Sequence, residues 1–260
     1  MIPADSPFSL SGKTALVVGA SRGIGLAIAQ AVAAAGARTL LAARSLDALE
    51  KHAAALRQAG CPAEALHLDV ADPNSIRSLA EAVGDVDILI NVAGINIRKA
   101  LLDFTQQEYE RLFQTNLHGI VDITRHIGAR MIARGQGGKI IYIGSMMSIL
   151  GLPYIVVYAI TKSGLAGLTR SLAAEWGRYN IQVNCIAPGF IETDLNRNVL
   201  QDPAFREWVK RAQASPRTGT PQDIAPVAVF LSSRASDYIT GQVISVDGGY
   251  STTAIWPFEP

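Results

Sequence analysis

Residues 14–32 read TALVVGASRGIGLAIAQAV, an apolar run followed by a glycine-rich turn and an alanine-rich helical segment. Gly19, Gly23 and Gly25 lie directly after the apolar run and open the helical one. Gly19 permits a tight turn, and the later glycines let a phosphate group and the strand approach the start of the helix. This stretch therefore predicts a nucleotide-binding strand–turn–helix unit, with a tight turn that binds no ligand as the alternative.

Apolar, β-rich runs alternate with helical segments along the rest of the chain. The expected strands are residues 13–20, 38–44, 64–70, 85–94, 138–145, 181–189 and 241–249. The expected helices are residues 24–37, 46–60, 73–83, 105–133, 158–179 and 221–233. Strands that are apolar on both faces and alternate with helices indicate a parallel sheet covered on both sides. We therefore expect an α/β fold with a doubly wound parallel sheet of about seven strands, helices on both faces, and a single domain over residues 1–260.

One segment, residues 195–215, breaks the alternation of strands and helices. Ligands bind at the mouth of a doubly wound sheet, and mobile segments often cover such sites. We therefore expect residues 195–215 to form a substrate lid.

The composition argues against several classes of protein. Hydrophobic residues make up 49% of the 260 residues and charged residues 17%, which is enough apolar material for a large core. The 23 basic and 22 acidic residues leave a net charge of +1, so we expect no attraction to nucleic acid or to an anionic membrane. We expect no signal peptide and no membrane span. Cys61 and Cys185 lack metal-binding spacing, which indicates free thiols in a cytoplasmic protein.

Tyr158 and Lys162 stand four positions apart in the apolar stretch VVYAITKSGL, residues 156–165. On a helix they would lie one above the other on the same face. A snorkelling lysine beside a packed tyrosine would explain the pair without any function. Alternatively, the ammonium stabilises the phenolate and lowers the tyrosine pKa from about 10, which makes the phenol a usable acid at neutral pH.

Two arginines bear on the choice of cofactor. The residue that ends the second strand of a nucleotide-binding sheet meets the adenosine ribose, and an acidic side chain there accepts from the 2′-OH. This chain instead has Ala43 followed by Arg44, and Arg22 lies within the glycine loop. Two guanidinium groups suit a 2′-phosphate, so we expect NADP(H) in preference to NAD(H). The alternative is a solvated Arg44 and an Arg22 that caps a helix; Asp69 could accept from the adenine amino group or merely start a helix.

These residues belong to a longer pattern that resembles the short-chain dehydrogenase/reductase family almost from end to end. The matching positions are Gly19-x-x-x-Gly23-x-Gly25, Asn91-Val-Ala-Gly94, Asn116, Ser145, Tyr158-x-x-x-Lys162, Pro188-Gly189 and Thr193. The chain departs from the family at Val18, where threonine is usual, and at Val92, where asparagine is usual. The resemblance implies a Rossmann-type fold and an oxidoreductase that interconverts a ketone and a secondary alcohol.

The resemblance implies four catalytic residues. Tyr158 would give a proton to the developing alkoxide, and Ser145, thirteen residues earlier, would hydrogen-bond the same oxygen. Lys162 would lower the pKa of Tyr158 and hold the nicotinamide ribose hydroxyls. Asn116 would interrupt its helix and hold a water that relays protons to Lys162, with a surface asparagine as the alternative. Ser148, which lies past the end of the strand expected over residues 138–145, is expected only to line the pocket.

The cofactor-binding residues implied by the resemblance and by the phosphate argument lie mostly in loops that follow strands. They are Gly19, Ser21, Arg22, Gly23, Ile24, Gly25, Arg44, Asp69, Val70, Asn91, Ala93, Gly94, Tyr158, Lys162, Pro188, Gly189, Ile191 and Thr193. The backbone of Ile191 and the hydroxyl of Thr193 would clamp the nicotinamide carboxamide.

The substrate is expected to be a small molecule bound by Arg98, Ser145, Met147 and Tyr158. Arg98 and Lys99 follow the fourth strand in a GIN-x-R-K stretch that resembles the sugar-acid branch of the family, including gluconate 5-dehydrogenases. We therefore expect Arg98 to recognise the carboxylate or polyol of a keto-sugar acid, with a solvated loop charge as the alternative. A 3-oxoacyl-thioester (acyl-carrier-protein) reductase, a broad carbonyl reductase and a nucleotide-binding scaffold without turnover remain open.

Rival sites fit the sequence less well. Ser145 is not in a G-x-S-x-G context, and no histidine is placed to serve a hydrolase. The four histidines show no metal-binding spacing, so no metal is expected. The carboxylates are scattered, without the pair that a glycosidase requires.

An oligomer is also expected. Ile255, Trp256 and Phe258 near the C-terminus would be a liability if exposed on a monomer, so we expect them to pack against a neighbouring subunit. The resemblance implies a tetramer built on the long helices and the last strand, and we expect a homotetramer or a homodimer.

Overall fold

The computed structural model describes residues 3–193 and 196–253, whose strands form one sheet. The strands are β1 (Thr14–Val18), β2 (Arg38–Ala43), β3 (Ala63–His67), β4 (Ile88–Asn91), β5 (Gly138–Ile143), β6 (Ile181–Pro188) and β7 (Val243–Val246). They lie in the order β3-β2-β1-β4-β5-β6-β7, and every neighbouring pair is parallel. The prediction of a doubly wound parallel sheet of about seven strands is confirmed.

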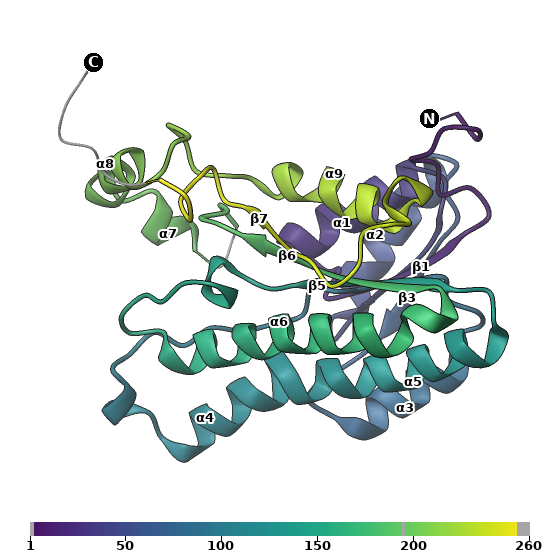
Figure 1. Ribbon diagram of the computed structural model, residues 1–260, viewed down its shortest axis with the longest axis horizontal. Coiled ribbons are helices and arrows are strands. Elements are labelled where there is room, and N and C mark those ends of the chain that lie inside the picture. Colours follow the sequence, from purple (N-terminus) through teal and green to yellow (C-terminus); the bar gives the residue numbers. More distant parts are fainter. Residues whose placement is uncertain (1–2, 194–195, 254–260) are drawn as a thin grey trace.

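Helices cover both faces of this sheet (Figure 1). One face carries α1 (Gly23–Ala34), α2 (Leu46–Gln58) and α9 (Pro221–Ser232); the other carries α3 (Pro73–Ala82), α4 (Gln106–Phe113), α5 (Gly119–Arg134) and α6 (Val156–Trp176). Further elements are α7 (Arg197–Leu200), α8 (Pro203–Ala212), η1 (Leu101–Asp103), the π-helical η2 (Gln114–His118), η3 (Met146–Ser148), η4 (Gly177–Tyr179) and η5 (Arg234–Ser236). The strand order reverses between β1 and β4, and ligands bind at the carboxyl ends of strands beside such a switch point.

Two apolar layers, one on each face of the sheet, form the core. The side chains of β1 alternate between them, with Ala15 and Val17 in the layer under α1, α2 and α9 and with Leu16 and Val18 in the layer under α3, α5 and α6. All four side chains are at most 1% exposed, which explains why the first strand reads as a continuous apolar run. This burial fixes the strand ends from which the loops of the site emerge.

Local sequence signals set the helix boundaries. Asp72 caps α3 by accepting a hydrogen bond from the backbone N–H of Asn74 (2.9 Å). Thr105 and Glu108 form a capping box at the start of α4. The helical region predicted over residues 105–133 is a continuous run of α4, η2 and α5, with the π-helical segment in its middle.

The third strand is shorter than predicted. The sequence favours an extended segment over residues 64–70, whereas β3 ends at His67, opposite Ala43 at the end of β2. Because β3 is an edge strand with β2 as its one neighbour, pairing stops where β2 stops. Beyond that point Asp69 Oδ1 accepts a hydrogen bond from the N–H of Ala71 (2.9 Å), which turns the chain toward α3.

The predicted lid segment, residues 195–215, contains two helices, α7 and α8, although Leu195 itself lies outside the described residues. Phe205 and Trp208 of α8 pack edge-on against Phe190, with ring centroids 5.4 and 5.5 Å apart. The segment therefore rests on the loop that follows β6, and its movement as a lid stays a prediction. The C-terminal side chains expected at a subunit contact also lie outside the described residues: Ile255, Trp256 and Phe258.

Candidate active site

The loops that follow β1, β4, β5 and β6 emerge at the same edge of the sheet, because all four strands are parallel. Figure 1 shows α7 and α8 at this end of the molecule, with the N-terminus at the opposite end. Most of the residues selected from the sequence lie in these loops or in the first turns of the helices that follow them. The parallel topology is therefore what brings them together.

Tyr158 and Lys162 lie in the first two turns of α6, as predicted. Lys162 is only 3% exposed, and its Nζ lies 5.7 Å from the centroid of the Tyr158 ring. The ammonium donates a hydrogen bond to the carbonyl oxygen of Ile143 at the end of β5 (2.7 Å). A snorkelling lysine would reach solvent, so this alternative is excluded.

The pKa values of this pair differ from the expectation. Burial raises the pKa of Tyr158, and a hydrogen bond with the Ser145 hydroxyl opposes that rise. Burial lowers the pKa of Lys162 to about 8. The predicted lowering of the Tyr158 pKa by Lys162 is therefore wrong for this structure, because loss of hydration disfavours the phenolate more than its surroundings favour it. Tyr158 keeps its proton at neutral pH, which suits a proton donor.

Ser145 lies at the end of β5 beside the first turns of α6. Its Oγ accepts a hydrogen bond from the N–H of Met147 (3.2 Å), and its hydroxyl is hydrogen-bonded to Tyr158. Met147 is buried in an apolar cluster with Met146 and Ile155, against which Tyr158 packs. The structure thus brings together three of the four residues predicted to bind the substrate: Ser145, Met147 and Tyr158.

Ser148 has a more defined place than expected. Its Oγ accepts a hydrogen bond from the N–H of Ser145 (3.3 Å) and donates one to the carbonyl oxygen of Lys162 (2.9 Å). The expectation that Ser148 only lines the pocket is therefore incomplete. Sequence reasoning missed this bridge because the relative placement of η3 and α6 is a tertiary feature.

Asn116 lies in the π-helical segment η2 and is fully buried. Its Oδ1 accepts from the N–H of Ile95 (2.8 Å), while its Nδ2 donates to the carbonyl oxygen of Ile95 (2.8 Å) and to Thr161 Oγ1 (3.3 Å). The predicted helix interruption is confirmed, and the surface-asparagine alternative is excluded. Asn116 ties the loop after β4 to α6, and the water that it would hold stays a prediction.

Gly94 lies between two of the predicted catalytic residues. A Cβ at this position would come within 3.4 Å of both Lys162 Nζ and Asn116 Oδ1. These distances correspond to van der Waals contact, so the loop after β4 runs directly beside both groups. This proximity places the predicted nicotinamide-side residues of β4 next to the catalytic helix.

The glycine loop has the geometry of an anion-binding turn. Gly19 has a φ of +91°, and a Cβ there would lie 2.7 Å from the backbone nitrogen of Ala93, while a Cβ at Gly25 would overlap the carbonyl oxygen of Gly19. The start of α1 therefore packs directly on the ends of β1 and β4. The Arg22 side chain makes no capping hydrogen bond, which excludes the capping alternative. The N–H groups of the first turn of α1, from Gly23 onward, remain available to a phosphate.

The loop after β6 lies opposite the glycine turn. A Cβ at Gly23 would meet Thr193 Cγ2 at 3.4 Å, so this loop faces the glycine turn. Asn196 Oδ1 accepts from the N–H (2.8 Å) and hydroxyl (3.0 Å) of Thr193, and its Nδ2 donates to the carbonyl oxygen of Ile191 (2.8 Å). Sequence reasoning missed Asn196. The tendency of asparagine to bond nearby backbone groups is the signal that could have revealed it.

Some of the remaining residues predicted to bind the cofactor make contacts in the structure, and others do not. Asn91 is buried; its Nδ2 contacts Thr124 Oγ1 at 3.4 Å, and its Oδ1 has no hydrogen-bond partner within the described residues. The carbonyl oxygen of Val70 lies so close to Gly119 that a Cβ there would overlap it. Four other predicted residues lie in or beside the turns that follow β1 and β6, without a contact that tests their roles: Ser21, Ile24, Pro188 and Gly189.

Arg22 and Arg44 are both exposed, and neither side chain has a hydrogen-bond or ion-pair partner in residues 3–193 and 196–253. Two free guanidinium groups thus stand beside the glycine loop and the end of β2. Asp69 does not cap α3, since Asp72 does so, and its carboxylate instead accepts from the N–H of Ala71. The predicted contacts of these residues with a 2′-phosphate and an adenine stay predictions.

The two cations after β4 have different surroundings. Lys99 Nζ forms an ion pair with Glu108 (2.8 Å), and the backbone N–H of Lys99 donates to the carbonyl oxygen of Tyr154 (2.9 Å). The hydrogen bond from Lys99 lowers the pKa of Glu108 to about 2. Arg98, next along the chain, is exposed and has no partner among the described residues. Of this pair, Arg98 is the cation left available to a substrate.

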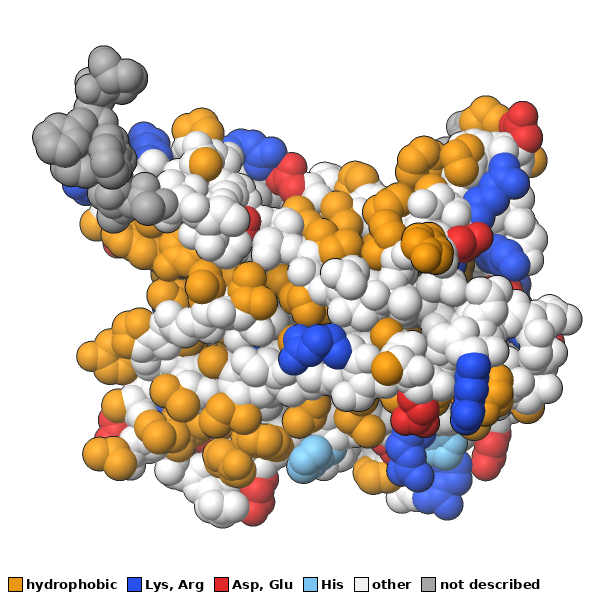
Figure 2. Space-filling model, viewed as in Figure 1, with side chains coloured by type: hydrophobic (Ala, Val, Ile, Leu, Met, Phe, Trp, Pro, Cys, Tyr) orange, Lys and Arg blue, Asp and Glu red, His pale blue; other side chains and the backbone are white. Residues whose placement is uncertain are grey.

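Apolar side chains are exposed around the end of the molecule at which the loops after β4 and β5 emerge. Figure 2 shows apolar side chains gathered there, and those in the neighbouring loops include Leu101, Leu102, Ile149 and Leu150. They belong to η1 after β4 and to the loop after η3. The surroundings of Arg98 therefore combine one free cation with apolar surface.

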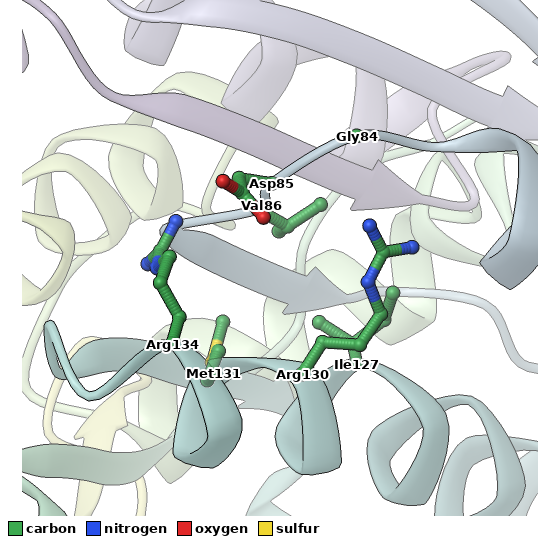
Figure 3. Close-up of a pocket in the computed structure, with 7 residues that line it drawn as sticks. All are labelled: Gly84, Asp85, Val86, Ile127, Arg130, Met131 and Arg134. Atoms are coloured by element: carbon green, nitrogen blue, oxygen red, sulfur yellow. The ribbon is translucent and has the colours of Figure 1, made fainter.

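A small concavity lies away from these loops, at the amino end of β4. Figure 3 shows Arg130 and Arg134 rising from α5 toward the loop that precedes β4. Arg130 Nη1 donates to the carbonyl oxygens of Ala80 (2.5 Å) and Val83 (2.7 Å) at the end of α3. Arg134 forms an ion pair with Asp87 (2.9 Å). These arginines fasten α5 to the end of α3 and to the start of β4, which is a structural role.

Three further observations bear on the sequence predictions. Within the described part of the chain, no group of three or more His, Cys, Asp or Glu side chains is arranged to hold a metal ion. A search of the same residues finds no helix with the length and apolar character of a membrane span. Cys61 and Cys185 are free thiols, and only Cys185 is fully buried.

Comparison with known proteins identifies relatives along nearly the whole chain. A family model described as Enoyl-(Acyl carrier protein) reductase matches residues 19–251. Gluconate 5-dehydrogenase of Gluconobacter oxydans is 37% identical over 250 residues, which cover 95% of this chain and 97% of that protein. The 3-oxoacyl-(acyl-carrier-protein) reductase of Escherichia coli is 39% identical over 245 residues, 93% of this chain and 98% of that protein. A structure of a gluconate 5-dehydrogenase from Burkholderia cenocepacia, in complex with NADP and tartrate, has a TM-score of 0.90 at 38% identity and covers 95% of this chain and 98% of that one.

Proposed function

The chain belongs to the short-chain dehydrogenase/reductase family, and from that premise we propose that it interconverts a keto-sugar acid and the corresponding secondary alcohol with NADP(H). It is an oxidoreductase of CH–OH groups, so the scaffold without turnover is set aside. The observation that carries the proposal is the convergence of Ser145, Tyr158 and Lys162 at the mouth of the sheet, with unpaired Arg98 on the adjoining loop.

The residues around the glycine loop fit a dinucleotide. Because Gly19 and Gly25 carry no side chain, the turn packs closely against the neighbouring backbone. No side chain caps the start of α1, so its N–H groups are available to a pyrophosphate. Arg22 and Arg44 would bind the 2′-phosphate of NADP(H), and Thr193 would hold the nicotinamide carboxamide. The bound NADPH supplies the hydride that reduces the substrate carbonyl.

The reaction then depends on a proton donor beside the carbonyl oxygen. Tyr158 holds its proton at neutral pH because burial raises its pKa, and it would release that proton as negative charge develops on the substrate oxygen. Ser145, already hydrogen-bonded to Tyr158, would donate to the same oxygen. Lys162, whose Nζ lies 5.7 Å from the centroid of the Tyr158 ring, would hold the hydroxyls of the nicotinamide ribose. Asn116 would hold the loop after β4 against α6.

Arg98 supports an acidic substrate. Its guanidinium is exposed without a partner, whereas neighbouring Lys99 is paired with Glu108. A planar guanidinium binds a carboxylate through two parallel hydrogen bonds, which suits a sugar acid. The names of the gluconate 5-dehydrogenases at 37 and 38% identity agree with this chemistry.

A steady-state assay tests the proposal. NADPH oxidation is measured with 5-ketogluconate, an uncharged ketose and a simple ketone, using wild type, Arg98→Ala and Arg77→Ala. Arg98→Ala should raise KM for the keto acid by about tenfold or more and leave the uncharged ketose unaffected. Arg77 is an exposed arginine on α3, and its variant should match wild type. An unchanged KM for the keto acid in Arg98→Ala would contradict the assignment.

A 3-oxoacyl thioester is the second candidate substrate. The Escherichia coli reductase of that class is 39% identical to this chain, and the exposed Leu101, Leu102, Ile149 and Leu150 could contact an acyl chain. The same assay with a 3-oxoacyl thioester separates the two. A kcat/KM for the thioester well above that for every sugar acid would replace the first proposal by the second.

We also propose that the protein is a homotetramer, with a homodimer as the alternative. A groove of about 460 Å³ on the outer faces of η2, α5 and α6 is lined in part by Leu117, Val121 and Leu168. Apolar surface of this kind on long helices suits contact with a second copy. Analytical ultracentrifugation should give a mass near four chains, and a single species at 27.6 kDa would contradict self-association. The free thiols and the NADP(H) chemistry support a cytoplasmic location.

A further inference from the structure

Two side-chain hydrogen bonds join the turn η3 to the catalytic helix α6. Ser148 Oγ donates to the carbonyl oxygen of Lys162 (2.9 Å), and Ser163 Oγ donates to the carbonyl oxygen of Met147 (3.1 Å). Ser148 Oγ also accepts from the backbone N–H of Ser145 (3.3 Å). One hydroxyl therefore connects the backbone of Ser145 to the backbone of Lys162.

We propose that Ser148 is a positioning residue that holds the Ser145 hydroxyl at hydrogen-bonding distance from Tyr158. The inference rests on the roles proposed above for Ser145 and Tyr158. Ser145 lies just before η3, two residues past the end of β5, whereas Tyr158 lies thirteen positions later, in the first turn of α6. The chain between them includes Tyr154, whose φ of +65° is unusual for a residue other than glycine, so it is an irregular loop. Ser148 spans this gap directly.

The surroundings of Ser148 fix the direction of its hydroxyl. A Cβ at Gly144 would lie 2.7 Å from Ser148 Oγ and 2.6 Å from Cys185 Sγ, so the hydroxyl packs closely against the backbone before Ser145. The Ser148 hydroxyl donates its hydrogen to the carbonyl oxygen of Lys162, and its oxygen accepts a hydrogen bond from the backbone N–H of Ser145. Alanine at position 148 would release the N–H of Ser145 and free the turn to shift relative to α6.

A shift of this kind affects catalysis more than binding. The hydrogen bond between Ser145 and Tyr158 depends on the relative placement of η3 and α6, whereas the residues proposed to bind the cofactor phosphates lie in the glycine loop and after β2, away from Ser148. Misplacement of a reacting group by about 1 Å can reduce a rate about a hundredfold. We therefore expect the Ser148→Ala variant to lose turnover and to retain NADPH affinity.

Ser163 provides a matched control. It joins the same turn to the same helix through the same type of hydrogen bond, but its partner is Met147 and it does not contact Ser145. Removing its hydroxyl tests whether any weakening of the contact between η3 and α6 is sufficient to slow the enzyme. The Ser148→Thr variant keeps a hydroxyl at position 148 and tests whether that hydroxyl is the required group.

The experiment compares wild type, Ser148→Ala, Ser148→Thr, Ser163→Ala and Tyr158→Phe. It measures kcat, KM, the solvent deuterium isotope effect on kcat, and the Kd for NADPH. Ser148→Ala should lower kcat by about 10- to 100-fold and raise the isotope effect, because proton transfer becomes slower. Its KM and NADPH Kd should stay within about threefold of wild type. Ser148→Thr should regain most of the lost rate, and Ser163→Ala should stay within about threefold of wild type.

Three results would overturn the inference: a Ser148→Ala variant with wild-type kcat and isotope effect, an equal loss in Ser163→Ala, or no recovery in Ser148→Thr. The Tyr158→Phe variant separates this inference from the proposed function. Its inactivity alongside a normal Ser148→Ala would refute only the positioning role. Its turnover at the wild-type rate would instead refute the chemistry proposed for the site.

Discussion

Replacing Arg44 by alanine should weaken NADPH binding and spare NADH. The guanidinium is exposed and has no partner among the described residues, so its removal breaks no existing interaction of the free protein. A charge-assisted hydrogen bond to a phosphate is weakened by solvent screening at an exposed site. It then contributes about 1.4 kcal/mol to the binding free energy, which corresponds to about a tenfold change in Kd. Arg22 is also free, and the Arg22→Ala/Arg44→Ala double variant should lose about a hundredfold if the two contributions add.

Quenching of protein fluorescence during titration with NADPH and with NADH measures both Kd values. Arg38→Ala is the matched control. Arg38 begins β2, whereas Arg44 follows the other end of this strand, and Arg38 forms an ion pair with Glu64 (2.9 Å). This control should bind both cofactors as wild type does. Equal losses of NADPH and NADH affinity in Arg44→Ala, or no loss of either, would refute the assignment of this arginine to the 2′-phosphate.

Two further outcomes follow from the pKa values of the site and its neighbours. Burial lowers the pKa of Lys162 to about 8 and raises that of Tyr158. Above about pH 8 the amine of Lys162 loses its charge while the phenol of Tyr158 keeps its proton, so kcat/KM for NADPH should fall as the pH rises. A flat profile to pH 9.5 would contradict this. The pKa of Glu108 is lowered from 4.5 to about 2 by Lys99, so its contribution to stability is complete above pH 4.5 and is lost as the pH falls toward 2. Glu108→Gln should therefore have a lower urea midpoint than wild type at pH 7, and the two midpoints should converge near pH 2; a constant difference across this range would show that the ion pair is not the cause.

The parts of the site that depend on local backbone geometry could be predicted from the sequence. Gly19 and Gly25 lie where a side chain would collide with backbone, and such positions leave a strong pattern in the amino-acid sequence. The four-residue spacing of Tyr158 and Lys162 likewise determines their common helix face. The alternation of apolar runs and helices predicted the order of the elements for the same reason: periodicity reflects local structure.

The parts that depend on tertiary contacts could not be predicted in the same way. Ser148 and Asn196 act through hydrogen bonds whose partners are set by how loops pack, and no spacing rule reveals such partners. The raised pKa of Tyr158 has a similar origin, since burial depends on the surrounding elements and outweighs the opposing hydrogen bond with Ser145. The end of β3 at His67 follows from the length of its neighbour β2.

The most direct test of the account is the rate of NADPH oxidation by Tyr158→Phe at saturating keto-sugar acid. The substitution removes one oxygen atom from a half-buried ring and leaves the packing against Met146, Met147 and Ile155 in place. Loss of a general acid should lower kcat by about 100- to 10,000-fold, while the Kd for NADPH stays within about threefold of wild type. A variant that turns over at the wild-type rate would show that the Tyr158 hydroxyl is not the proton donor.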